Sequence, residues 1–141
     1  MADSFLDGIA RHLADKTLID YRPDDTGGDT FLEGMPSGPD RACALTIYDA
    51  GDEPDSLLPY DEPRLQVRTR AWDPSESRDW CADLYGELNG LGPVDLPDGT
   101  RLILSVALQP GPASIGKDQN GRHEHSCNFR MERYNPTTHR P

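Results

Sequence analysis

Residues 64–71 read Arg-Leu-Gln-Val-Arg-Thr-Arg-Ala, the cleanest alternation of polar and apolar side chains in the sequence. This alternation predicts a β-strand with one face on a core, because successive side chains point to opposite sides of a strand. Arg64, Arg68 and Arg70 all fall on the polar side. We therefore expect one face of the sheet to be exposed and strongly cationic.

A helix is predicted to follow this strand directly. Asp73-Pro74-Ser75-Glu76 places an acid at the N-cap, a proline at the first helical position and a glutamate at the third. Apolar side chains then recur at helical spacing until the glycines at positions 90 and 92, which end the pattern. We expect the helix to run to about residue 89.

The other apolar segments complete the expected fold. They predict a helix over residues 4–15 and strands over 42–48, 101–108 and 123–134. The order helix-strand-strand-helix-strand-strand favours an α+β fold with a mostly antiparallel four-stranded sheet, helices packed on one face, and long loops. Residues 21–41 are expected to form an irregular loop with room for a short strand at 30–32, and residues 135–141 a polar tail that frays.

Composition bounds the class of protein. The chain has 141 residues, enough for a single domain, and a formal net charge of −11, which argues against a protein that grips a phosphate backbone. No apolar run approaches the ~20 residues of a membrane span, and the first residues do not predict a secretory signal. Cys43, Cys81 and Cys127 are odd in number and widely spaced, which indicates buried thiols in a reducing compartment.

The sequence offers little for catalysis. His123-Glu124-His125 could direct two imidazoles at one metal ion, but a site needs a third ligand and nothing nearby in the sequence supplies one. We favour a polar stretch of an edge strand, and keep a small metal-dependent enzyme as the alternative from another class. Phosphate-binding, dinucleotide-binding and nucleophile-elbow motifs are absent from the sequence. We therefore expect no enzyme and no cofactor.

Acidic residues gather between the second and third predicted strands. Residues 49–63 contain six acids and no base, and three prolines there argue against regular structure. The predicted arginine face could form salt bridges with this loop, or it could meet the acidic surface of a partner such as a second copy. Contacts between unlike patches are heterologous and can close into rings. The candidate interface acids are Asp52, Glu53, Asp55, Asp61 and Glu62.

Residues 109–122 form a second long segment rich in glycine and proline. It is longer than a hairpin needs, and an isolated Ile115 lies near its expected tip. Long loops in compact domains are usually functional or disordered. We expect this loop to take part in binding.

From about residue 42 onward, the sequence resembles the tail terminator (minor capsid protein) family of long-tailed bacteriophages. Four stretches carry the resemblance through their order and spacing. They are Tyr60–Ala71 with its proline and arginines, Glu76–Leu91, Leu108–Arg122 and Ser126–Arg133.

The resemblance implies a small α/β subunit that forms a hexameric ring in the virion, at the head-proximal end of the tail. Such rings cap the tail tube, stop its growth and join it to head-completion proteins, while DNA passes through the lumen without specific binding. Assembly in the host cytoplasm, with no membrane involved, is also expected. The arginines and acids named above would then serve subunit contacts, and Pro110, Ile115, Lys117, Asp118 and Arg122 would contact the tail tube. A head-side connector or stopper protein is the closest alternative.

Overall fold

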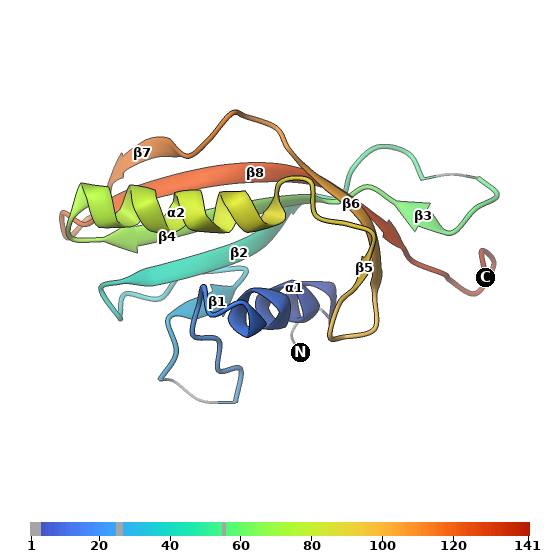
Figure 1. The fold of residues 1–141 in the computed structure, drawn as a ribbon, viewed down its shortest axis with the longest axis horizontal. Coiled ribbons are helices and arrows are strands. Elements are labelled where there is room, and N and C mark those ends of the chain that lie inside the picture. The colour runs from blue at the N-terminus through green and yellow to red at the C-terminus, as the bar shows by residue number, and fades with distance from the viewer. Residues whose placement is uncertain (1–3, 25–26, 55) are drawn as a thin grey trace.

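A computed structural model describes residues 4–24, 27–54 and 56–141. Across these residues the chain forms two helices and eight strands, all of the strands in one curled sheet (Figure 1). The helices are α1 (Ser4–Asp15) and α2 (Pro74–Leu88). The strands are β1 (Thr30–Leu32), β2 (Ala42–Asp49), β3 (Tyr60–Asp61), β4 (Arg64–Ala71), β5 (Val94–Asp95), β6 (Arg101–Ala107), β7 (Ala113–Lys117) and β8 (His123–Tyr134).

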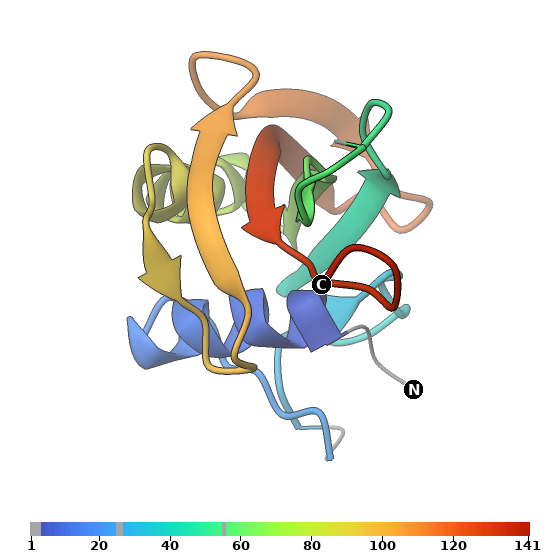
Figure 2. The same ribbon diagram turned by 90° about the vertical axis from the view of Figure 1, so that its right-hand side faces the viewer.

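The sheet is built around β8, the last and longest strand. The strand order is β1-β2-β4-β8-β6-β5, and the short strands β3 and β7 also pair with β8. β1 lies parallel to β2, whereas the other ladders are antiparallel. Figure 2 shows how strongly the strands curl across the sheet.

The predicted four-stranded, mostly antiparallel sheet in the order helix-strand-strand-helix-strand-strand is wrong. The sheet has twice as many strands and is mixed, because β1 adds a parallel pair. The missed strands β3, β5 and β7 have two to five residues each and lie in segments rich in glycine and proline. Their strand conformation comes from pairing with β8 or β6, which a local sequence pattern does not reveal.

Both helices pack against the same face of the sheet. Leu65 and Val67 of β4, Cys127 and Phe129 of β8, and the apolar stripes of the two helices form one buried cluster. The predicted start of α2 is confirmed, since the Asp73 side chain accepts a hydrogen bond from the Ser75 amide at 2.9 Å and proline follows the cap. We call the opposite face of the sheet the outer face.

The chain ends beside β3 (Figure 1). The Asn135 amide donates to the Pro59 carbonyl at 2.7 Å, and the Arg140 guanidinium donates to the carbonyl oxygens of Leu58 and Tyr60. The tail was expected to fray, but these contacts hold it against the acid-rich segment at 49–63.

Candidate subunit interface

The outer face carries polar side chains from β4 and β8 in facing rows. The antiparallel register sets Arg64 opposite Arg130, Arg68 opposite Ser126, and Arg70 opposite Glu124. Directly paired residues share a face of the sheet, so these side chains lie together away from the helices. The predicted alternation is confirmed on the inner side, where Leu65, Val67 and Thr69 are fully buried.

The predicted arginine face does not remain free along its whole length. At one end, Arg64 Nε lies 3.8 Å from Asp49 Oδ2, and Arg64 Nη2 lies 3.9 Å from Asp52 Oδ2. These are long ion pairs between partly exposed groups, which contribute little to stability. Arg64 therefore meets the acids of its own chain, as the internal salt-bridge interpretation expects.

Arg70 is buried rather than exposed. Its guanidinium donates to the carbonyl oxygens of Pro39, at 2.5 Å, and Asp40, at 3.3 Å. Only 4% of the residue is accessible, because residues 35–40 cross the outer face at this point. Burial, followed by the nearby charge of Arg122, lowers the pKa of Arg70. Its role in the structure is to hold a loop.

Arg122 ties two distant loops together. Its guanidinium donates to Asp118 Oδ2 at 2.8 Å, to the Ser37 carbonyl at 2.7 Å and to Asp40 Oδ1 at 3.1 Å. Only 3% of its side chain is accessible. Burial raises the pKa of Asp118, but hydrogen bonds from the backbone and side chain of Arg122 outweigh it and lower that pKa overall. Both residues, predicted from the sequence as tail-tube contacts, are engaged within the subunit.

Arg68 lies on β4 between Arg64, which pairs with acids, and Arg70, which is buried. It lines a cavity of about 320 Å³ on the outer face. Arg70, Arg122, Asp118 and Glu124 also line it. We call this space the arginine cavity. Its lining residues come from the end of β4 and the start of β8, and Figure 1 shows these two strand ends at its left.

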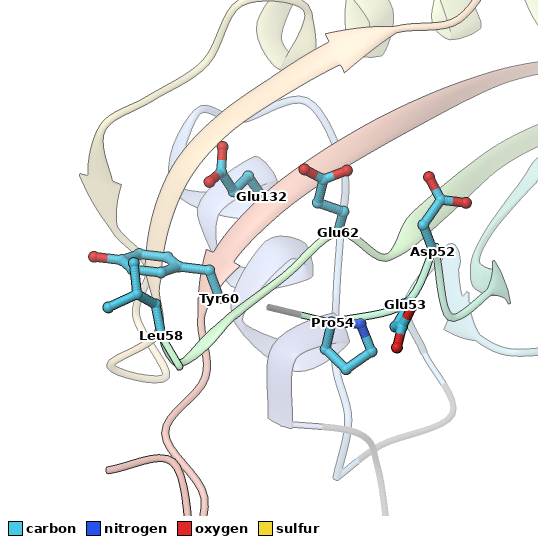
Figure 3. A pocket seen from close by; sticks show the side chains of 7 residues that line it. All are labelled: Asp52, Glu53, Pro54, Leu58, Tyr60, Glu62 and Glu132. Carbon is cyan, nitrogen blue, oxygen red and sulfur yellow. The ribbon is translucent and has the colours of Figure 1, made fainter. Parts of the chain in front are cut away.

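The opposite end of the outer face is acidic. We call residues 49–62 the acidic lobe; Asp55 lies outside the described residues. A pocket of about 280 Å³ in this lobe is lined by Asp52, Glu53, Pro54, Leu58, Tyr60, Glu62 and Glu132 of β8. Figure 3 shows the carboxylates of Asp52, Glu62 and Glu132 on one side of the chain, with Glu53 turned the other way.

Two of the predicted interface acids also have partners within the chain. Asp61 Oδ1 lies 3.6 Å from Arg140 Nη1, and Asp61 Oδ2 accepts a hydrogen bond from Asn135 Nδ2. Asp61 therefore anchors the tail. Glu62 lies 3.7 Å from Arg130 across the outer face. Sequence reasoning missed Arg130 and Glu132, whose outward positions on β8 follow from its alternation.

The segment expected to be a loop at 109–122 contains β7. Ala113 pairs with Ser126 and Lys117 with His123, so the segment returns along β8 as an edge strand. Ile115 is 48% accessible, and Pro110 and Lys117 are also exposed. Gly116 has φ of +94° at the register shift in this ladder, a conformation that glycine adopts without strain. These three predicted tail-tube residues are therefore available at the surface.

The histidine cluster has a structural setting. β8 is a central strand rather than the expected edge, and it directs His125 to the helix side, where Nδ1 lies 2.9 Å from Ser77 Oγ. His125 is 5% accessible, and burial, then the charges of Arg78 and His123, lower its pKa. Among the described residues no three His, Cys, Asp or Glu side chains are grouped to hold a metal ion.

The cysteines lie in the core. All three are fully buried free thiols, as expected from their positions on apolar faces, and the Sγ atoms of Cys81 and Cys127 are 3.5 Å apart. Burial raises the pKa of Cys43, which keeps its thiol protonated and unreactive. None of the helices in the described part of the chain has the length and apolarity to cross a membrane.

Comparison with known proteins gives the context of this surface. Residues 12–135 match the sequence model of a family described as bacteriophage tail terminator protein. The chain belongs to this family. The family resemblance found in the sequence is thus confirmed, and the tail terminator is a structural phage tail protein and a component of the virion. No curated protein matches it.

Proposed function

We propose that this tail terminator assembles head to tail into a hexameric ring that caps the tail tube. The ring ends growth of the tube and provides the joint to head-completion proteins, with DNA passing through its lumen. Membership of the terminator family over residues 12–135 is the observation that carries the proposal. The subunit acts by assembly and performs no catalysis.

The charge distribution supports a heterologous contact between copies. The acidic lobe and the arginine cavity lie toward opposite ends of the same sheet face. Complementary charges at the two ends favour repeated head-to-tail association, which closes into a ring when the rotation between neighbours allows. The net charge of −11 on each subunit also suits a conduit for DNA, because a negatively charged ring repels the phosphate backbone.

The exposed edge strand β7 supports a separate contact with the tube. Pro110, Ile115 and Lys117 lie at the surface, so the contact is available without opening the subunit. An edge strand also presents backbone donors and acceptors to a partner. We assign this edge to the tail-tube protein, and the two ends of the outer face to neighbouring copies.

Light scattering and negative-stain electron microscopy test the proposal. The purified chain, alone and with assembled tubes of its own phage, should give rings with a mass of about 94 kDa for six copies of the 15.6 kDa chain. Antibody labelling should then place the chain at the head-proximal end of the tail. A chain that stays monomeric in the presence of tubes, or labels the head side of the joint only, contradicts the proposal.

A further inference from the structure

We infer that the arginine cavity of one copy receives the carboxylate of Glu53 from a neighbouring copy, with Arg68 as its ion-pair partner. The inference rests on the proposed ring and names the two groups that join its subunits. It also separates Arg68 from the other arginines of β4, which serve their own subunit.

Arg68 is the arginine of the outer face that has no partner among the residues the structure describes. Within the described part of the chain, no carboxylate oxygen lies within 4.0 Å of its guanidinium and no hydrogen-bond acceptor reaches it. Its Nε also has no hydrogen-bond partner, but that atom is inaccessible to solvent, so an incoming group can contact only the Nη atoms. A half-buried charge without a partner costs free energy, and an acceptor for the Nη atoms recovers part of that cost.

The subunit cannot supply that acceptor from its acidic lobe. Along the strands the nearest lobe acid is Asp49, which is paired with Arg64, four residues from Arg68 on β4. At about 3.3 Å per residue this separates the two backbones by roughly 13 Å, beyond the combined reach of the two side chains. The nearby Asp118 is already bound to Arg122 at 2.8 Å. Glu124 lines the same cavity but has no oxygen within 4.0 Å of Arg68, so among the described residues the subunit leaves this position open to a carboxylate from another chain.

The cavity suits one carboxylate better than a phosphate chain. Asp118 and Glu124 line the same space as Arg68, Arg70 and Arg122, so the local charge is mixed. Each phosphate of a nucleic acid would have to approach these two acids as well as a subunit of net charge −11. A single carboxylate can contact the Arg68 guanidinium in a bidentate manner and add only one negative charge.

Glu53 is the lobe acid best placed to leave its own subunit. It is exposed, has no ion pair or hydrogen bond in the described part of the chain, and turns away from the row formed by Asp52, Glu62 and Glu132 (Figure 3). In contrast, Asp52 and Glu62 each lie within 4.0 Å of an arginine of the same chain. Removing Glu53 from water therefore breaks no hydrogen bond or ion pair with another described residue.

Zero-length cross-linking tests the pair directly. An Arg68→Lys variant is mixed as equal parts of light and ¹⁵N-labelled protein under the conditions in which the wild type assembles, and treated with a carbodiimide. Mass spectrometry should find an amide between position 68 and Glu53 in mixed-isotope pairs. The Gln66→Lys variant is the matched control, because position 66 lies on the same face one pair along β4, and it should not link to Glu53. Links from position 68 that join only residues of one copy overturn the inference.

Charge reversal gives a second, quantitative test. Arg68→Glu should raise the concentration for half-assembly at least about tenfold, and adding Glu53→Arg to that variant should restore most of the loss. The Tm of Arg68→Glu should not fall, because Arg68 makes no hydrogen bond or ion pair with the residues that the structure describes. Assembly of Arg68→Glu at the wild-type concentration rejects the inference and leaves the ring standing. A wild-type chain that forms no assembly rejects the ring and the inference together.

Discussion

The two ends of the outer face carry ion pairs of very different character. At the arginine cavity, Arg122 lies 2.8 Å from Asp118 and 3.1 Å from Asp40, and its side chain is 3% accessible. At the acidic lobe, the pairs of Arg64, Arg130 and Arg140 with acids span 3.6 to 3.9 Å and involve more accessible groups. Short bonds from a buried guanidinium hold loops in place, whereas long pairs near solvent contribute little.

The comparison shows that charged residues on one sheet face can have opposite uses. The cavity end employs most of its cations to fasten residues 35–40 and 118–122. The lobe end depends on its backbone for shape and leaves its carboxylates near the surface. Substitutions at four positions test this difference.

Arg122→Ala should cause the largest loss of stability. It leaves Asp118, Asp40 and the Ser37 carbonyl without their shared donor, and we expect the free energy of unfolding to fall by about 3 kcal/mol. Arg130→Ala, which removes a 3.7 Å pair at the lobe end, is the control and should cost less than about 1 kcal/mol. Urea unfolding measures both values. Equal losses would remove the distinction between the two ends.

Gly51→Ala should disturb the acidic lobe through its backbone. Gly51 has φ of +102°, and a side chain there would collide with the Glu62 carbonyl. We expect a cost of about 2 kcal/mol from strain and displacement of the lobe. Gly86→Ala is the matched control, because that exposed position in α2 has open space, and it should be neutral or stabilising by up to about 1 kcal/mol. If the two variants have the same Tm, the lobe does not depend on this turn.

His125 should give the cavity end a mild dependence on pH. Because its pKa in the folded state is lowered, the unfolded state binds the proton more tightly, so stability falls as pH decreases below about 6.5. His125→Asn should weaken this dependence between pH 7.5 and pH 5.5, as measured by thermal unfolding. His139→Asn, in the exposed tail, should keep the wild-type profile. An unchanged profile in His125→Asn would show that other groups cause the loss.

Arg64→Ala should have the smallest effect of the four. Its contacts to Asp49 and Asp52 are 3.8 and 3.9 Å long, and its Nε is buried without a hydrogen bond. We expect the free energy of unfolding to change by less than about 0.5 kcal/mol in low salt and by less still in 0.5 M salt. Chemical denaturation at the two salt concentrations measures this. A loss approaching that of Arg122→Ala would mean that the lobe is held by charge after all.

Local sequence signals predicted the long elements well. β4 occupies 64–71 and β8 occupies 123–134, as their alternation indicated, and α2 begins after the predicted cap and ends within a residue of the expected boundary. In these segments the repeat of apolar residues and the end signals agree over many positions. The short strands β3, β5 and β7 lack such repeats and exist because a longer strand lies alongside.

Whether a predicted site residue is exposed or engaged within the subunit depends on contacts between residues far apart in the sequence. Local sequence patterns do not reveal these contacts. Alternation placed Arg70 on the outer face correctly, but residues 35–40 bury it from some thirty positions away. The sequence predicts Arg122 in a binding loop, whereas its hydrogen bonds to Ser37 and Asp40 anchor it within the subunit. Arg68 and Arg70 are two positions apart on β4 and follow the same alternation. Only the tertiary structure therefore distinguishes Arg68, which lacks a partner among the described residues, from Arg70, which is anchored.

The central position of β8 has a consequence for biosynthesis. The strand that pairs with β3, β4, β6 and β7 leaves the ribosome after all four of them. Until it emerges, the nascent chain exposes the hydrogen-bonding edges of β4 and β6, and the sheet cannot close. The subunit therefore cannot complete its fold before residues 123–134 have been synthesised, and a chain cut short before residue 123 would lack the strand that unites its two halves.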